Sequence, residues 1–359
     1  MAEQAVLPHG VMEGKGSYNR HATVPAGGGA LAIPALEDAA RRVAVEPEDR
    51  PLVIADYGSS QGRNSLGPMR AALRALRARV RADRPVFIFH IDQPSNDFNS
   101  LFEVLSSDPD RYAADHVDVF PCAVGRSFYE QVLPPESVHV GWCSFAALWL
   151  SRIPGLLPGH FIAVHGSGPG HDAFARQAAE DWETFLRLRA RELRPGGRLV
   201  IVLPARNDEG VTGYEDFMDQ ANGALGEMVD AGEIRREERA RMVLGPYPRQ
   251  RSELLAPFQA GHFTELRVEH YELLSLPDAA WGDYERDGDA RAMATKHALF
   301  FRSVFVPSLA SALDGVRAGD AAAGNAFADT LQERMIRRLA ADAQPLDSFV
   351  QTMVVAKVG

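Results

Sequence analysis

Two acids and a glycine turn stand where a nucleotide-like ligand could be held. The stretch "VIADYGSSQGRNSL" (53–66) runs from an apolar segment through Asp56 to Gly58 and the entry of a helix. The next apolar run, "PVFIFHID", ends in Asp92, 34 residues after Gly58. A carboxylate at the end of a second strand can accept hydrogen bonds from both hydroxyls of a ribose. The pattern therefore predicts a site for a ribose-containing ligand.

The turn differs from the phosphate-binding fingerprint of dinucleotide sites. That fingerprint is GxGxxG after the first strand, with an acid about 20 residues later for the ribose. Here the turn reads Gly58-Ser-Ser-Gln-Gly62, and Asp56 lies just before it. Acids near the turn would repel a pyrophosphate but tolerate a cationic sulfonium, which favours S-adenosylmethionine (SAM). The residues alone leave two other interpretations of this turn open. It could belong to a dinucleotide site, or it could cap a helix without binding any ligand.

Charge, cysteine content and apolar runs argue against several classes of function. The formal charge of the 359-residue chain is −10, which makes a nucleic-acid partner unfavourable. Cys122 and Cys143 have no CxxC spacing, and the loop histidines His160, His165 and His171 lack the spacing and acids of a metal site. No run reaches the about 18–20 apolar residues of a membrane span, and the N-terminus resembles no signal sequence. We expect a cytoplasmic protein without a metal site or a membrane contact.

Strand-like and helical patterns alternate between residues 51 and 204. Apolar runs typical of buried strands lie at 51–56, 85–92, 118–124, 137–142 and 198–204. Helical patterns separate several of them, including a long amphipathic stretch that Pro-Gly-Gly ends. Alternation of this kind predicts an α/β fold, with helices on both faces of a parallel sheet. The later chain is mostly helical and charged, which predicts a helical cap on that sheet.

A more specific motif follows the second predicted strand. "DQPSNDFNSLFEVL" (92–105) is similar to the "DLPGNDFN-LF" segment of the SABATH family, SAM-dependent methyltransferases named for their salicylate, benzoate and theobromine-forming members. "GSYNR" (16–20) resembles the family's N-terminal "SYAxNS" arm, and "ADYGSSQGRNSL" (55–66) resembles "ADLGCSSGPNTL". Further segments follow in the family's order from about residue 12 to the C-terminus. The chain is identified as a bacterial-looking member of this family.

The resemblance implies a set of cofactor contacts. By position, three residues would line the methionine side of SAM, namely Asp56, Gly58 and Asn64. Asp92 would bind the ribose hydroxyls, with Gln93 beside the adenosine. Ser127 and Phe128 would lie against the adenine. Tyr18 of the arm would close over the reacting methyl group, where it would touch both cofactor and acceptor.

The resemblance also implies a pocket for the methyl acceptor. Phe145, Leu148 and Trp149 stand at i, i+3 and i+4, so they are expected on one helical face that forms a wall of this pocket. The family points the indole of Trp149 at the substrate carboxylate. The family's carboxylate-binding Gln falls on Pro25 here, and we hypothesise that His21 takes its place.

Pattern and resemblance together predict a class I (Rossmann-like) SAM-dependent methyltransferase sheet with a helical cap. The expected parts are an N-terminal active-site arm (1–35), a SAM-binding α/β core (36–204), a helical cap with one core strand near 261–274 (205–344) and a C-terminal strand of the core sheet (345–359). The family commonly forms homodimers, so a homodimer is expected.

The implied reaction is carboxyl methylation. A methyl group would pass from the sulfonium of SAM to a carboxylate oxygen by in-line SN2 transfer, giving a methyl ester and S-adenosylhomocysteine (SAH). A carboxylic acid with a pKa of about 4–4.5 is already ionised at neutral pH, so no general base and no catalytic residue beyond positioning is expected. The acceptor would be a small aromatic or medium-chain aliphatic acid. Two alternatives stay open, an N-methyltransferase of a heteroaromatic substrate and a non-catalytic relative that binds SAM or an acid.

Overall fold

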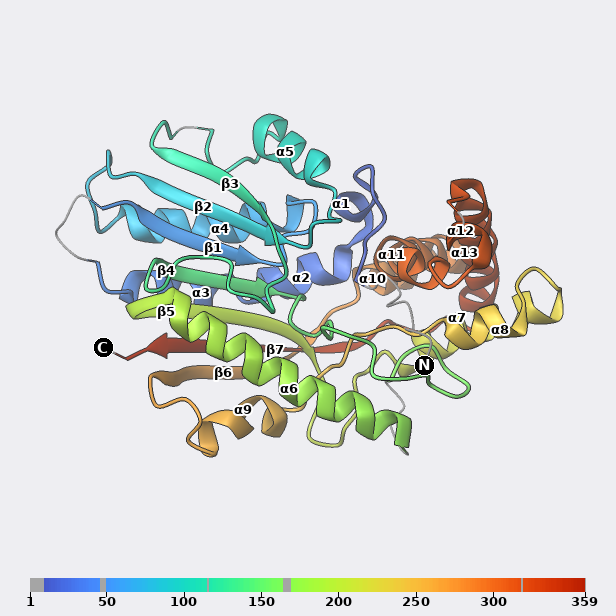
Figure 1. Ribbon diagram of the computed structural model, residues 1–359. Coiled ribbons are helices and arrows are strands. Elements are labelled where there is room, and N and C mark those ends of the chain that lie inside the picture. The colour runs from blue at the N-terminus through green and yellow to red at the C-terminus, as the bar shows by residue number, and fades with distance from the viewer. Residues whose placement is uncertain (1–9, 46–49, 115, 164–168, 318, 359) are drawn as a thin grey trace.

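A single seven-stranded sheet organises the molecule (Figure 1). The structure, a computed structural model, describes residues 10–45, 50–114, 116–163, 169–317 and 319–358. The strand order is β3-β2-β1-β4-β5-β7-β6, in which β7 alone runs antiparallel to its neighbours. The strands are β1 (Leu52–Tyr57), β2 (Val86–Asp92), β3 (Val119–Gly125), β4 (Val138–Ser144), β5 (Leu193–Ala205), β6 (Leu266–Leu276) and β7 (Ser348–Lys357). The predicted α/β sheet is confirmed.

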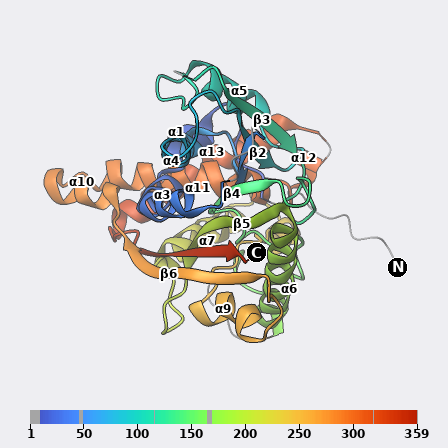
Figure 2. The same ribbon diagram turned by 90° about the vertical axis from the view of Figure 1, so that its left-hand side faces the viewer.

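Helices cover both faces of the sheet because the central strands bury apolar residues on alternating sides. Ile54 of β1 packs into one core with α3 (Ile33–Arg42) and α4 (Arg63–Arg77). Ala55, the next residue, packs into a second core with α6 (Pro169–Glu192). Figure 2 shows α3 and α4 on one side of the sheet and α6 on the other.

Most of the later helices gather beyond one end of the strands (Figure 1). They are α7 (Glu215–Asp230), α8 (Arg236–Arg241), α10 (Ala279–Asp287), α11 (Ala290–Ala310), α12 (Asp314–Arg317) and α13 (Ala321–Ala341). Two others lie along the sheet, α5 (Phe98–Ser107) after β2 and α9 (Arg251–Gln259) before β6. Among the helices described, none combines the length and apolar character needed to cross a bilayer.

The N-terminal arm is more regular than its sequence suggests. Residues 1–35 show no sustained helical period, yet the structure has α1 (Ser17–His21) and α2 (Thr23–Leu31) there. The α2 sequence, TVPAGGGAL, has poor helix propensity, so packing must hold it. A Cβ atom on Gly28 would lie 2.4 Å from the ring of Phe145, which shows how closely α2 approaches the sheet.

The structure also differs from the prediction at Pro-Gly-Gly (195–197), which was expected to separate a helix from a strand. These residues belong to β5, which begins directly after α6 at Leu193. The pairing of β5 with β4 shifts register between Val138 and Val140, so the strand absorbs the three residues as an irregularity rather than ending at them.

Candidate functional site

Two cavities lie where the arm, the loops that follow the strands and the cap helices meet. The first, called the polar cavity, has about 770 Å³ of empty space and is lined by the arm, the loop after β1, the end of β2 and the turn after β4. The second, called the apolar cavity, has about 710 Å³ and extends among β7, α7 and α11.

Asp92 is the most constrained side chain of the polar cavity. Its Oδ2 accepts a hydrogen bond from the backbone N–H of Ser60 at 2.7 Å, and its Oδ1 accepts one from the N–H of Gln93 at 2.7 Å. Burial, together with the charge of Asp56, raises the pKa of Asp92 to about 6 against those two hydrogen bonds. The carboxylate is thereby fixed in orientation at the end of β2.

Gly58 brings the loop after β1 against the turn after β4. Its φ is +89°, in the left-handed region, and a Cβ atom there would lie 2.1 Å from the Cβ of Ala146. Only glycine fits both conditions. Gly58 and Ala146 therefore form adjoining walls of the polar cavity.

The charge of the polar cavity fits a cation rather than a pyrophosphate. Asp92 and Asp97 line it, and among its described lining residues there is neither Lys nor Arg. The hydroxyl of Ser60, another lining residue, is buried without a hydrogen-bond partner. A ligand with a ribose diol and a positive charge would satisfy these groups.

The side chain of Asp56 was expected to contact the ligand, but it contacts other residues of the protein. It is 2% exposed and does not line the polar cavity. Its Oδ2 accepts a hydrogen bond from the hydroxyl of Ser65 at 2.6 Å and lies 2.9 Å from Nδ1 of His90. The other ring nitrogen of His90 lies 2.8 Å from the hydroxyl of Tyr112. Asp56 thus serves contacts within the protein, and its expected contact with the methionine part of SAM stays a prediction.

Asn64 and Tyr18 form a pair on the arm side of the site. Tyr18 lines both cavities, and its hydroxyl is hydrogen-bonded to the side chain of Asn64. Burial and the neighbouring Asp92 raise the pKa of Tyr18, so the phenol stays neutral. Asn64 lines neither cavity and also donates to the carbonyl of Ala22 at 3.4 Å. Asn64 therefore lies behind Tyr18 as seen from the cavities, and its expected contact with SAM stays a prediction.

His21 lies away from both cavities. It is absent from their described walls, and the charges that act on it are those of Arg20, Glu13 and Arg302. Burial, with Arg20 beside it, lowers the pKa of His21. The hypothesis that His21 replaces the family's carboxylate-binding Gln gains no support from this position.

Glu13 fastens the arm to two other parts of the molecule. Its carboxylate accepts from Nε of Arg302 on α11 at 2.8 Å, and its backbone N–H donates to the carbonyl of Ser303 at 2.9 Å. Its carbonyl accepts from the side-chain amide of Gln61, in the loop after β1, at 2.7 Å. The arm therefore ties the cap to the loop that lines the polar cavity.

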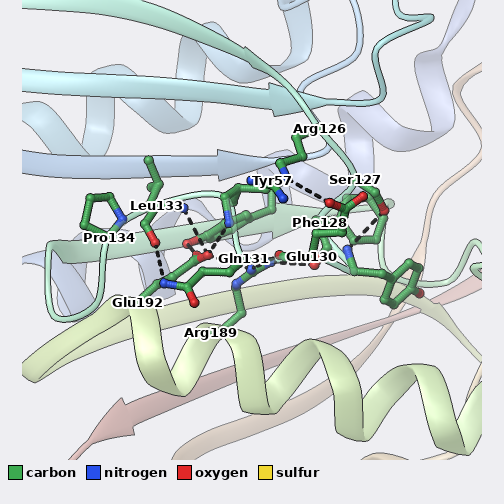
Figure 3. Close-up of polar contacts among 12 residues, drawn as sticks. Tyr57, Arg126, Ser127, Phe128, Glu130, Gln131, Leu133, Pro134, Arg189 and Glu192 are labelled. Atoms are coloured by element: carbon green, nitrogen blue, oxygen red, sulfur yellow. Dashed lines mark hydrogen bonds and ion pairs between the residues drawn. The ribbon is translucent and has the colours of Figure 1, made fainter.

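The loop between β3 and β4 carries Ser127 and Phe128, and a buried ion pair holds it (Figure 3). Arg189 and Glu192 of α6 are fully buried and 2.9 Å apart. Arg189 donates to the carbonyl of Phe128 at 2.8 Å, while Glu192 accepts from the N–H of Val132 at 2.7 Å. Phe128 lines the polar cavity, whereas Ser127 does not line it and instead lines a neighbouring cavity that Phe128 also borders.

The sequence prediction missed this ion pair, although a signal for it exists. Arg189 stands four residues after Phe185 and three after Leu186, both fully buried in α6. A charged residue on the apolar face of a helix must be paired to be buried. That position alone could have identified Arg189 as a structural cation.

The residues expected on a helical face form a turn. Phe145 has φ of +55°, in the left-handed region, and residues 145–150 are not helical. Other side chains hold the turn by its carbonyls: Arg249 donates to that of Ala147 at 2.8 Å, and the Tyr129 hydroxyl donates to that of Trp149 at 2.8 Å. The i, i+3, i+4 spacing was therefore misleading, because tertiary contacts override it.

The turn still forms a wall of the apolar cavity. Phe145, Leu148 and Trp149 line it, opposite apolar side chains of α11 that include Phe305. Four side chains line both cavities, namely Met12, Tyr18, Phe145 and Trp149. The two cavities thus adjoin, and a small group could pass from a ligand in one to a ligand in the other.

No metal-binding cluster is present in the described part of the chain, counting groups of three or more His, Cys, Asp or Glu. His165 lies outside the described residues.

Comparison with known proteins agrees with this geometry. A family model described as SAM dependent carboxyl methyltransferase matches residues 5–354. A methyltransferase of the fungus Gibberella fujikuroi is 29% identical over 236 residues, which are 65% of this chain and 63% of that protein. The salicylate carboxymethyltransferase of Clarkia breweri is 30% identical over 250 residues, 66% of this chain and 67% of that one. The match thus spans less than two thirds of the fungal relative's length.

A solved structure supports the fold. Loganic acid methyltransferase with SAH superimposes with a TM-score of 0.75, covering 98% of this chain and 99% of that chain. The sequences are 22% identical, so this likeness speaks for the fold alone.

Proposed function

The chain belongs to the SAM-dependent carboxyl methyltransferase family, and on that premise we propose that it methylates the carboxylate of a small acid. The acceptor is a small aromatic or medium-chain aliphatic acid, and the products are its methyl ester and SAH. The observation that carries the proposal is that a polar, acidic cavity and an apolar cavity share four lining side chains.

The polar cavity suits SAM, which supplies an electrophilic methyl group on a sulfonium. Asp92 accepts hydrogen bonds from the ribose hydroxyls. Two backbone N–H groups hold its carboxylate oxygens in the orientation that this needs. Gln93 lies beside the adenosine and Phe128 against the adenine. The acidic walls favour the cationic end of the molecule. Ser127, which precedes Phe128 in the same loop, lies against the adenine as well.

The apolar cavity suits the acid. The indole N–H of Trp149 makes no hydrogen bond within the described part of the chain, and it is free to donate to the acid's carboxylate. No Lys or Arg is found among the described lining residues, so no cation weakens the nucleophilic oxygen. Tyr18 and Phe145, at the junction, keep water from the reacting atoms. Positioning of this kind lowers a barrier by up to about 7–11 kcal/mol.

A transfer assay tests this proposal. SAM labelled in its methyl group is incubated with the protein and a panel of aromatic and aliphatic acids, and the label is followed into base-labile methyl esters. Esters are the expected result. Label in a heteroaromatic amine panel instead would support the N-methyltransferase, and SAH binding without any transfer would support a non-catalytic relative. Either outcome would overturn carboxyl methylation.

We also propose a homodimer, a cytoplasmic location and the four-part division at residues 35, 204 and 344. Phe120 of the edge strand β3 stacks on Phe87 of β2 with ring centroids 5.3 Å apart, and Phe120 is 43% exposed, which suits a contact with a second copy. Cys122 and Cys143 are both free thiols, as a reducing compartment favours. The bacterial source stays a prediction.

A further inference from the structure

Besides Tyr18 at the junction, two residues with hydroxyl groups interrupt the otherwise apolar wall of the apolar cavity. Ser348, at the start of β7, lines it and is 5% exposed, and its Oγ is buried without a hydrogen-bond partner. Tyr214, the N-cap residue of α7, lines it and is 9% exposed. No hydrogen bond of its phenol is found within the described part of the chain, and burial raises its pKa.

Tyr214 is an exception among the buried tyrosines. The hydroxyl of Tyr57 donates to Glu192 at 2.8 Å, that of Tyr112 lies 2.8 Å from His90, and that of Tyr247 donates to Glu253 at 2.8 Å. Buried tyrosine hydroxyls normally find such partners, since an unpaired one costs free energy. The hydroxyl of Tyr214, a residue of the cavity wall, therefore stays available to a ligand.

Ser348 and Tyr214 stand on neighbouring segments. The backbone N–H of Phe349 donates to the carbonyl of Thr212 at 3.1 Å, and a Cβ atom on Gly213 would lie 3.3 Å from the Cα of Ser348. The two unpartnered hydroxyls therefore belong to one end of the cavity.

That end lies away from the junction of the two cavities. Neither Ser348 nor Tyr214 lines the polar cavity. Val350 lies near the junction, because it and the junction residue Phe145 both flank Gly28. Ser348 precedes Val350 by two positions, which is about 6.6 Å along a strand. A ligand that extends from the junction would reach the two hydroxyls with its far end.

We propose that the acid bound in the apolar cavity carries a hydrogen-bonding oxygen at the end remote from its carboxylate, and that Ser348 and Tyr214 bind this oxygen. The oxygen is a hydroxyl, carbonyl or ether group. The proposal rests on carboxyl methylation as the proposed function, and it narrows the substrate class from apolar acids to acids with a distal oxygen.

The energetic reason is the cost of leaving both hydroxyls unpaired. An apolar acid that fills the cavity excludes water and gives them no partner, whereas an oxygenated acid pairs them. Sites built to bind a polar group discriminate strongly against the analogue that lacks it. We expect a preference of at least about tenfold in kcat/KM for the oxygenated acid, which is the effect of one well-paired hydrogen bond.

The test uses matched pairs of acids. Rates of labelled methyl transfer are measured for benzoate and 4-hydroxybenzoate, for 3-phenylpropanoate and 3-(4-hydroxyphenyl)propanoate, and for octanoate and 8-hydroxyoctanoate. At least one hydroxylated acid should exceed its partner about tenfold, mainly through KM, and the double variant S348A/Y214F should bring that ratio to within about twofold. Ratios near one in every pair, or a preference that survives in the double variant, would overturn the inference.

The proposed function fails in a different way. If SAH binds but none of the six acids is methylated, carboxyl methylation itself is wrong, and this inference falls with it. If the acids are methylated without a preference, only the inference is wrong.

Tyr247→Phe is a matched control for Tyr214→Phe. Tyr247 lies outside the cavity wall and its hydroxyl is hydrogen-bonded to Arg206 and Glu253, so Tyr247→Phe should lower Tm and leave the substrate ratio unchanged. Tyr214→Phe should lower the ratio and leave Tm unchanged. A loss of Tm in Tyr214→Phe equal to that of the control would show a structural partner and contradict the proposal.

Discussion

Arg189 of α6 reaches the carbonyl of Phe128 with a hydrogen bond of 2.8 Å, so a helix on the sheet face positions a loop that lines the polar cavity. The same guanidinium lies 2.9 Å from Glu192 and 4.3 Å from the ring centroid of Tyr57. One buried cation thus connects α6, the end of β1 and the loop after β3.

Replacing Arg189 with Met should therefore affect both stability and binding. The change leaves the carboxylate of Glu192 buried without its cation, so the free energy of unfolding should fall by about 3–5 kcal/mol. SAM affinity should fall as well, because the backbone of Phe128 loses its support. Denaturant unfolding and calorimetry measure the two effects. Arg187→Met, on the exposed side of the same helix, is the control and should stay within about 0.5 kcal/mol.

SAM affinity should depend on pH through Asp92. Its pKa of about 6 in the free protein means that acidification to pH 5 protonates the carboxylate that accepts the ribose hydroxyls. The Kd for SAM should rise by up to about tenfold between pH 7 and pH 5. Asp92→Asn should bind SAM at least about tenfold more weakly at pH 7 and lose this dependence. A flat profile in the unaltered protein would contradict the assignment.

The same carboxyl should cost the free protein stability at neutral pH. Its pKa is raised from 3.8 to about 6, so the folded state holds the proton more tightly than the unfolded state. The contribution of Asp92 therefore becomes more favourable as pH falls from above 6 toward 4, and it is least favourable at pH 7. Without SAM, Asp92→Asn should have a higher Tm than the unaltered protein at pH 7, with a smaller difference at pH 4.5. A lower Tm at pH 7 would mean that the carboxylate is needed for the fold.

Trp149 should affect the acceptor more than the cofactor. Trp149→Phe keeps an aromatic ring but removes the N–H that we assign to the carboxylate, so KM for the acid should rise at least about tenfold. The Kd for SAM should change little. His21→Ala serves as the arm control and should leave KM for the acid unchanged, because His21 lines neither cavity. An unchanged KM for the acid in Trp149→Phe would contradict the assignment of this N–H to the carboxylate.

The ion pair between Glu13 and Arg302 should govern how firmly the arm is held. Arg302→Gln removes the charge that binds Glu13 at 2.8 Å, so limited proteolysis should cut the arm faster and SAM affinity should fall, with a weaker effect at high salt. Arg291, on the same helix as Arg302, forms an exposed ion pair with Glu333 of α13, and Arg291→Gln is the control. Equal cutting rates in the two variants would show that the pair does not hold the arm.

Local patterns in the sequence were enough for the sheet and for part of the site. The apolar runs locate β1 and β2, and parallel strands bring their carboxyl ends to one edge, so Gly58, Asp92 and Gln93 come to one cavity. The roles of these residues in binding stay predictions.

The remaining features depend on contacts between distant segments. The carboxylate of Asp56 contacts the ring of His90. The turn that begins at Phe145 is held by a hydrogen bond from Arg249, which lies about a hundred residues later in the chain. Ser348 reaches the cavity only because β7 enters the sheet beside β5. No periodicity near these residues records such partners, so a single sequence cannot reveal them.

The position of β7 has a consequence for synthesis of the protein. β6 precedes β7 in the chain, yet β7 lies between β5 and β6 in the sheet. A growing polypeptide therefore exposes β6 with no strand beside it while the ribosome is still translating α10 to α13. Unpaired strand edges of this kind invite aggregation, so this interval is when a nascent chain most needs a chaperone.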